Sequence, residues 1–259
     1  MNLGLQGRKA IVCASSRGLG RACAMALARE GVAVVVNGRD VEQVEATAAA
    51  IRSETGAEVT AVAADLCSDE GRARLVAACP EPDILVTNNG GPAPGRFEDW
   101  DHAAWLAALE QNLLAPALLI RAVIGGMRAR RFGRIVNITS AMVKSPHPLM
   151  GLSTAARSAL TAVCKGLSRE VARDNVTINN LLPERIDTDR QRFMAGLQAA
   201  ARGISIEQAY EDIAASIAAN RLGTPEEFAA ACIYLCSDQA GFVSGQNLQI
   251  DGGSYVGLI

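Results

Sequence analysis

The stretch KAIVCASSRGLG, residues 9–20, decides the fold of this chain. Its apolar first half is typical of a buried strand, and the small residues that follow, with Gly18 and Gly20, predict a tight turn that opens a helix. A turn of this kind directs backbone N–H groups and the positive end of a helix toward a pyrophosphate. Because every tight strand-to-helix turn favours glycine, the stretch indicates a dinucleotide site only together with the rest of the chain.

The same alternation continues along the chain, with short β-branched runs between longer Ala-rich amphipathic stretches. We predict strands at 9–13, 32–37, 58–63, 84–87, 134–139, 177–182 and 248–250. We predict helices at 18–30, 41–55, 69–79, 102–131, 152–173 and 225–237. Strands that alternate with helices form a parallel sheet covered on both faces. The predicted fold class is therefore α/β, a single doubly wound Rossmann domain over residues 1–259.

Residues 184–220 depart from the alternation, because two extra helical stretches precede the last helix. Ligands of open α/β sheets bind beyond the carboxyl ends of the strands, and this insert follows such an end. We therefore predict a small helical lid over a substrate. Its apolar residues, such as Phe193 and Met194, are mixed with charges and fit an apolar substrate no better than a pair of core-facing helices.

The composition narrows the class of protein. With 49% hydrophobic and 20% charged residues, the 259-residue chain is not disordered. Its 25 Lys and Arg against 27 Asp and Glu lack the basic excess that nucleic-acid binding needs, so we expect no nucleic-acid partner. The seven cysteines are scattered without a C-x-x-C pair, so we expect core cysteines rather than disulfides or a metal site.

Membrane association is not expected either. No apolar run in the sequence approaches the roughly 20 residues of a membrane span, and residues 1–7 lack the features of a signal peptide. The predicted location is cytoplasmic.

Two arginines favour one nicotinamide cofactor over the other. The second strand ends in Asn37-Gly38-Arg39, without the acidic residue that would hold a free ribose 2′-hydroxyl. Arg17, in the first turn, and Arg39 flank the expected adenosine site. Ordinary surface charge is the alternative, but two cations without an anion favour a 2′-phosphate, and hence NADP(H) over NAD(H).

In the order of its motifs the chain resembles the short-chain dehydrogenase/reductase superfamily, from residue 5 to residue 253. The family's T-G-x-x-x-G-x-G loop corresponds to residues 13–20, its D-[VL] pair to Asp65-Leu66, and its N-N-A-G motif to residues 87–90. Its P-G-x-[IV]-x-T motif corresponds to residues 183–188, with Glu184 where the family has Gly.

The end of the chain, residues 221–253, is similar to the bacterial 3-oxoacyl-carrier-protein reductase branch. The resemblance implies dinucleotide binding, a small-molecule substrate and a homotetramer. Exposed apolar positions on the predicted helices 102–131 and 152–173 agree with subunit contacts. The predicted NADP(H) contacts are Ala14, Ser15, Ser16, Arg17, Gly18, Leu19, Gly20, Asn37, Arg39, Asp65, Leu66, Asn88, Asn89, Gly90, Arg157, Pro183, Ile186 and Thr188.

The active-site pattern is only partly present. The resemblance implies catalytic roles for Asn112 and Ser140, but the family's Tyr and Lys are replaced by Ser153 and Arg157. A serine hydroxyl is a far weaker acid than a phenol, and arginine keeps its proton near neutrality. Arg157 can still bind ribose oxygens and supply positive charge.

The proton donor is therefore open between two hypotheses. A water held by Ser140 and Ser153 could fill the space left by the absent Tyr. Alternatively His147 could donate the proton, because its loop is expected to border the pocket and the ordinary pKa of histidine suits a general acid. A surface histidine without a catalytic role accounts for this residue equally well. Pro116 lacks the N–H that would donate to the Asn112 carbonyl, so that carbonyl is free to bind a water. The resemblance implies that this water belongs to the family's proton-relay chain. Alternatively, Pro116 only kinks the helix for packing.

Three functions compete. The first is an NADP-dependent reductase of 3-oxoacyl thioesters or other ketones with an atypical proton donor. The second is a catalytically impaired dinucleotide-binding homologue that acts as a sensor or partner subunit. The third is a cofactor-free lyase, since halohydrin dehalogenases resemble this fold and have an Arg at the position of Arg157; their Tyr is missing here.

Overall fold

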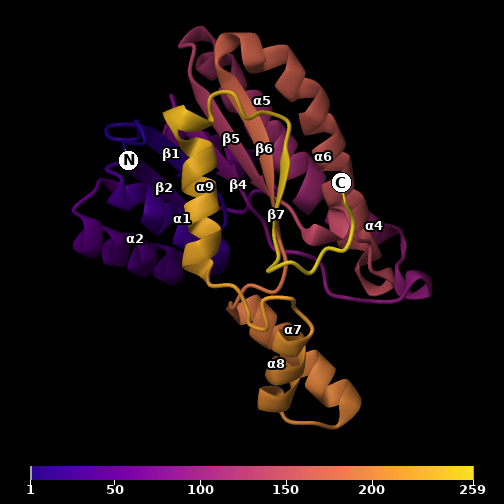
Figure 1. Cartoon of the computed structure of the whole chain (residues 1–259). Coiled ribbons are helices and arrows are strands. Elements are labelled where there is room, and N and C mark those ends of the chain that lie inside the picture. The colour runs from indigo at the N-terminus through magenta and orange to yellow at the C-terminus, as the bar shows by residue number, and fades with distance from the viewer. Residues whose placement is uncertain (1, 259) are drawn as a thin grey trace.

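The computed structural model describes residues 2–258 and contains one seven-stranded parallel sheet in the order β3-β2-β1-β4-β5-β6-β7 (Figure 1). The strands are β1 (Lys9–Val12), β2 (Ala33–Gly38), β3 (Val59–Ala63), β4 (Ile84–Thr87), β5 (Gly133–Ile138), β6 (Val176–Pro183) and β7 (Asn247–Ile250). The predicted strands and the doubly wound parallel sheet are confirmed, with ends shifted by one residue.

Helices cover both faces of this sheet. The α-helices of the described residues are α1 (Gly18–Arg29), α2 (Val41–Thr55), α3 (Asp69–Ala78), α4 (His102–Leu109), α5 (Ala115–Ala129), α6 (Gly151–Val171), α7 (Asp189–Arg202), α8 (Ile206–Ala215) and α9 (Pro225–Cys236), of which α7 and α8 lie apart from the sheet. Successive strand residues point to opposite faces. Thus Val34 and Val36 of β2 join the core under α1, α2 and α9, whereas Val35 joins the core under α3, α5 and α6.

Local capping explains where several helices begin. The Asp40 side chain accepts from the Gln43 N–H at the start of α2. At α9, Thr224 and Glu227 form a reciprocal capping box with Pro225 in the first turn. Both cap signals are local in sequence, so both helix starts could be predicted.

The predicted helix 102–131 is interrupted. A π-helical turn, Glu110–Leu114, separates α4 from α5, and the Ala115 N–H donates to the Glu110 carbonyl, five residues back. The next residue, Pro116, has no N–H to continue the regular ladder, so the extra residue is accommodated here. Asn112 lies inside this turn.

One sequence expectation needs correction at this helix. The described chain contains a helical stretch, His102–Ala129, that is long and apolar enough by length and composition to cross a bilayer. Its inner residues, among them Leu119 and Met127, are buried against the sheet. Because packing on a sheet and insertion into lipid both need apolar residues, length and composition do not distinguish the two. Leu106 and Leu114 remain exposed on its outer side.

The helices α7 and α8 project from the carboxyl edge of the sheet (Figure 1). They are the two helical stretches predicted within residues 184–220. They pack on each other through Ala195, Ala199, Ala209 and Ile213, apart from the sheet cores. Their role as a substrate lid stays a prediction.

Candidate active site

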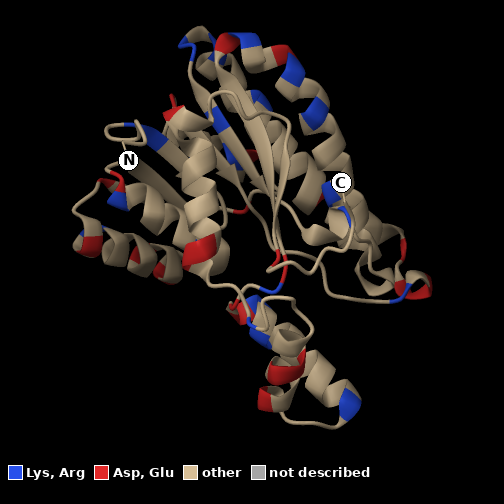
Figure 2. Ribbon diagram, in the orientation of Figure 1, with Lys and Arg blue, Asp and Glu red and all other residues tan. Residues whose placement is uncertain are grey.

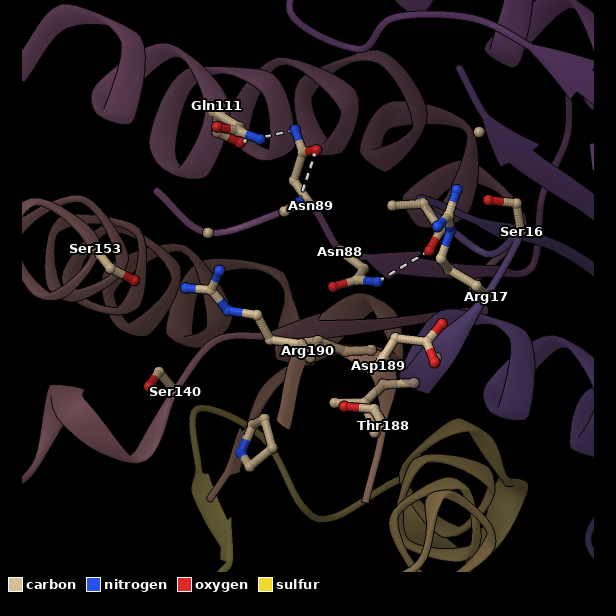
Figure 3. Close-up of a pocket in the computed structure, with 18 of the residues that line it drawn as sticks. Ser16, Arg17, Asn88, Asn89, Gln111, Ser140, Ser153, Thr188, Asp189 and Arg190 are labelled. Atoms are coloured by element: carbon tan, nitrogen blue, oxygen red, sulfur yellow. Dashed lines mark hydrogen bonds between the residues drawn. The ribbon is translucent and has the colours of Figure 1, made fainter. Parts of the chain in front are cut away.

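A cavity of about 670 Å³ lies at the carboxyl ends of the central strands, where α/β sheets bind ligands. Figure 3 shows Ser16 and Arg17 at one end and Ser140 and Ser153 at the other, with the start of α7 between them. We call these the phosphate end and the nicotinamide end. Most predicted site residues line this one cavity, although they come from seven separate segments of the chain.

The phosphate end is built on a strained turn. Ala14 has φ +43°, a left-handed conformation that favours glycine, which is the family residue at this position. The Asn37 side chain accepts from the Ala14 N–H (3.2 Å), and Asn88 donates to the Ala14 carbonyl (3.1 Å) (Figure 3). A Cβ on Gly20 would overlap that same carbonyl oxygen, so the helix can approach only with glycine there. The two asparagines thus hold the turn that faces the cavity.

Arg17 and Arg39 are exposed and line the phosphate end. Three carboxylates share it. Asp40 caps α2, and Asp65 accepts from the Cys67 N–H (3.0 Å). The Asp189 carboxylate is turned toward Arg17 without forming an ion pair with it (Figure 3). Within residues 2–258, neither arginine has an ion-pair partner. This leaves both cations available to an anionic ligand.

At the nicotinamide end, Arg157 is buried and held by three hydrogen bonds. It donates to the carbonyl oxygens of Ile138 (2.8 Å) and Asn89 (3.2 Å) and, through Nε, to Ser153 Oγ (3.2 Å). Burial, with a smaller contribution from Arg190, lowers the pKa of Arg157 to about 10, so the guanidinium is charged at neutral pH. A guanidinium has five N–H groups, and two of them remain free.

Ser140 and Ser153 accompany Arg157 in the cavity lining. Ser140 Oγ accepts from the Met142 N–H (3.2 Å), and Ser153 Oγ accepts from Arg157. Each hydroxyl therefore keeps its own proton for a further partner. A Cβ added to Gly91 would lie 3.9 Å from Ser153 Oγ, in ordinary van der Waals contact, so the backbone at Gly91 faces the serine closely.

His147 lies away from these residues. Its Nδ1 accepts from the Leu149 N–H (3.3 Å) and caps a short 3-10 turn, and the side chain is exposed. From this loop Met150, not His147, lines the cavity. The expectation that His147 borders the pocket is therefore wrong, because its imidazole serves as a local cap.

Asn112 is buried in the π-helical turn, behind the cavity wall. Among the described residues, neither its amide nitrogen nor its amide oxygen has a hydrogen-bond partner. Buried amides in folded proteins are nearly always satisfied by protein or by water. The neighbouring Gln111 lines the cavity, and its carbonyl accepts from Asn89 (3.1 Å). The side-chain amide of Asn112 therefore has room for a polar partner, while the relay water on its backbone carbonyl stays a prediction.

The remaining predicted contacts follow β6. Pro183, Ile186 and Thr188 line the cavity, and Thr188 caps α7 by accepting from the Gln191 N–H. Glu184 is half-buried in the same lining, and burial raises the pKa of its carboxyl; Arg185 lies 3.9 Å away. The replacement of the family Gly by Glu184 thus places a carboxyl group in the cavity lining.

Arg190 is a cavity residue that the sequence did not predict. It lies in the first turn of α7, lines the cavity, and donates from Nη2 to the Pro92 carbonyl across the cavity (3.1 Å). Its helical position gave no signal, because the partner is 98 residues away in the chain.

Comparisons with known proteins agree with this geometry. Residues 13–255 match the family described as enoyl-(acyl carrier protein) reductase. The NADPH-dependent reductase BacG of Bacillus subtilis is 31% identical over 252 residues, covering 95% of this chain and 97% of BacG. The chain belongs to the short-chain dehydrogenase/reductase superfamily. The resemblance seen in the motifs is confirmed.

Other members of this superfamily match over similar lengths. Dehydrogenase/reductase SDR family member 4 of Bos taurus is 34% identical over 255 residues, covering 96% of this chain and 88% of that protein. L-Sorbose reductase of Gluconobacter frateurii, solved with NADPH and L-sorbose, superimposes with a TM-score of 0.95 at 28% identity over the whole of both chains. The NADPH-dependent reductase YwfH, involved in bacilysin biosynthesis, has a TM-score of 0.92 at 30% identity, with 98% of this chain and 100% of YwfH covered.

Proposed function

We propose that this superfamily member is an NADP-dependent oxidoreductase that transfers hydride between the nicotinamide and a carbonyl or alcohol substrate. The observation that carries the proposal is the shared cavity. One end presents Arg17 and Arg39 without ion-pair partners among the described residues, and the other presents Ser140, Ser153 and the buried cation Arg157. The relatives described as NADPH-dependent reductases support the choice of cofactor.

The residues of the cavity suit NADP(H). The turn from Ala14 to Gly20 opens α1, so its N–H groups and the helix N-terminus would hold the pyrophosphate. Arg17 and Arg39 would hold the 2′-phosphate, and Asp65 and Leu66 would border the adenine. The bound cofactor supplies the hydride.

At the nicotinamide end, Ser140 and Ser153 would donate hydrogen bonds to the substrate oxygen. Arg157 donates to Ser153 Oγ, which orients the serine proton away from the guanidinium. The positive charge of Arg157 then favours the oxygen as negative charge develops on it. A water held by the two serines would deliver the proton, and because water is a weaker acid than a phenol, we propose that proton transfer limits turnover.

Titration with NADPH, followed by turnover assays with 3-oxoacyl thioesters and simple ketones, tests this function. We expect binding and slow reduction. Tight binding without turnover would favour the alternative of an impaired homologue that acts as a sensor or partner subunit. That alternative is supported by the absence of any tyrosine from the described cavity lining. Failure to bind NADPH would contradict both and favour the cofactor-free lyase.

A homotetramer and a cytoplasmic location are further proposals. Leu106 on α4, Leu114 in the π-helical turn and Val163 on α6 are exposed apolar side chains on neighbouring helices. Light scattering at micromolar concentration should report a tetramer, and a monomer would contradict the proposal.

A further inference from the structure

Arg190 has no part in the reaction as proposed, yet it occupies the cavity. Its guanidinium is turned toward Ser153, away from Ser16 and Arg17 (Figure 3). The hydrogen bond to the Pro92 carbonyl (3.1 Å) holds the side chain across the cavity, between α7 and the loop after β4. Arg190 therefore faces the nicotinamide end rather than the phosphate end.

The charges around Arg190 are not balanced. Figure 2 shows acidic and basic residues together where α7 begins beneath the sheet. The acidic residues near it in sequence are directed elsewhere: the Asp189 carboxylate is turned toward Arg17 (Figure 3), and Asp187 accepts from the Tyr210 hydroxyl (3.3 Å). Glu184 lies 3.9 Å from Arg185. Across the described chain, no ion pair involves Arg190 or Arg157. The buried Arg157 and the more exposed Arg190 thus bring two positive charges to this end of the cavity.

This arrangement is electrostatically unfavourable without an anion. Burial lowers the pKa of Arg190, and burial together with Arg190 lowers that of Arg157. An anion placed between the two guanidinium groups would offset both the burial of charge and their mutual repulsion. Arg202 on the same helix, by contrast, pairs with Asp212 (2.6 Å) and does not line the cavity. Arg190 thus brings an unneutralised positive charge into the cavity.

We propose that the substrate is a keto acid, whose carboxylate is bound by Arg190 and by the free N–H groups of Arg157. This inference rests on the proposed function and narrows its substrate class from thioesters and neutral ketones to free acids. A planar guanidinium donates two parallel hydrogen bonds to a carboxylate. Because Arg157 also contacts Ser153, the carboxylate lies within a few bonds of the carbonyl that the serines would hold.

The test compares three keto acids, pyruvate, acetoacetate and levulinate, with their methyl esters. The esters keep the ketone and remove the negative charge. The variant Arg190→Met removes the guanidinium, and Arg192→Met is the matched control. Arg192 lies on the same helix and stacks on Tyr210, as Arg190 stacks on Phe193, but it does not line the cavity.

With NADPH, we expect at least one acid to be reduced with a kcat/KM about 30-fold above that of its ester, the effect of one charged hydrogen-bonding partner. Arg190→Met should remove this preference and change ester reduction less than about 3-fold, while Arg192→Met should preserve it. NADPH affinity should stay within about 2-fold in both variants. If Arg190→Met weakens NADPH binding and lowers acid and ester reduction alike, Arg190 serves the cofactor pyrophosphate and the inference is wrong.

Calorimetry separates this inference from the proposed function. Protein loaded with NADP⁺ cannot reduce a ketone, so the acid and its ester can be titrated without turnover. We expect the acid to bind about 30-fold more tightly, and the difference to vanish in Arg190→Met. Equal binding of acid and ester overturns the keto-acid inference even if neutral ketones are reduced. Acid-selective binding without turnover of any substrate supports it while contradicting the proposed reduction.

Discussion

At the phosphate end of the cavity, the family pattern is nearly complete and its side chains hold neighbouring loops in place. Asn37 and Asn88 bind the backbone of Ala14, and Asp40 caps the helix that follows it. At the nicotinamide end, two of the family's residues are replaced, and Arg157 binds the carbonyl oxygens of two different strand ends. The comparison teaches that the scaffold of the site persists where its chemistry has changed.

The largest effect is expected when the buried positive charge at the nicotinamide end is removed. Arg157→Met should lower kcat/KM for carbonyl reduction by about 100-fold or more, because stabilisation of a developing oxyanion contributes about 3 kcal/mol. Arg157→Lys keeps the charge and should lose less than about 10-fold. Steady-state kinetics measure both, with thermal unfolding to establish that each variant is folded. Equal losses in the two variants would show that shape, not charge, matters at this position.

The assignment of the phosphate end is tested by the relative affinity for NADPH and NADH. The unmodified protein should bind NADPH about 100-fold more tightly than NADH. NADPH has a 2′-phosphate that can accept charge-assisted hydrogen bonds from Arg17 and Arg39, whereas NADH has none. Arg39→Asp should reverse the preference, measured by fluorescence titration with both cofactors. Arg21 is an exposed arginine on α1 outside this cavity, so Arg21→Asp is the matched control. This control should leave the preference for NADPH unchanged. Equal affinity of the unmodified protein for both cofactors would contradict the assignment.

Restoring the family's Tyr and Lys tests whether their replacement slows proton transfer at the nicotinamide end. Ser153→Tyr combined with Arg157→Lys should raise ketone reduction by about 10-fold or more, because a phenol of lowered pKa is a better acid than water. Ser153→Ala should change the rate less than about 3-fold, since the water persists. His147→Ala should have no effect, given its position outside the cavity. A rate that collapses in Ser153→Ala would show that the serine itself is essential.

The smallest effect is expected at Glu184, between the two ends. Burial raises the pKa of this carboxyl above its ordinary 4.5, so the folded protein keeps the proton to a higher pH than the unfolded chain does. Stability is therefore greatest below pH 4.5 with respect to this group, and falls as pH rises through the raised pKa. Glu184→Gln should remove this dependence and, without a carboxylate near the cofactor, tighten NADPH binding a few-fold at neutral pH. Urea unfolding from pH 4 to 7 and NADPH titration measure the two effects; an unchanged pH profile would contradict the assignment.

Most of the fold and half of the site could be predicted because their signals are local. Strand and helix periodicity, the caps at Asp40 and Thr224, and the glycines of the first turn each act within a few residues of chain. The resemblance to the family placed Ser140, Ser153 and Arg157 in the site, and all three line the cavity. The interruption at Glu110–Leu114 did not, because Pro116 predicts a lost hydrogen bond but not how the helix adjusts to it.

The order of strands and helices, the phosphate turn, and the replacement of the family's Tyr and Lys could all be read from the sequence. The contacts of the replacing residues, Ser153 and Arg157, became known only from the tertiary structure. Arg157 bonds to residues 19 and 68 positions away, and Arg190 reaches a carbonyl 98 positions away. It also decided that His147 caps its own turn instead of facing the cavity. Periodicity and caps act through neighbouring residues, whereas the direction of a side chain in a cavity depends on which distant segments the folded sheet brings together.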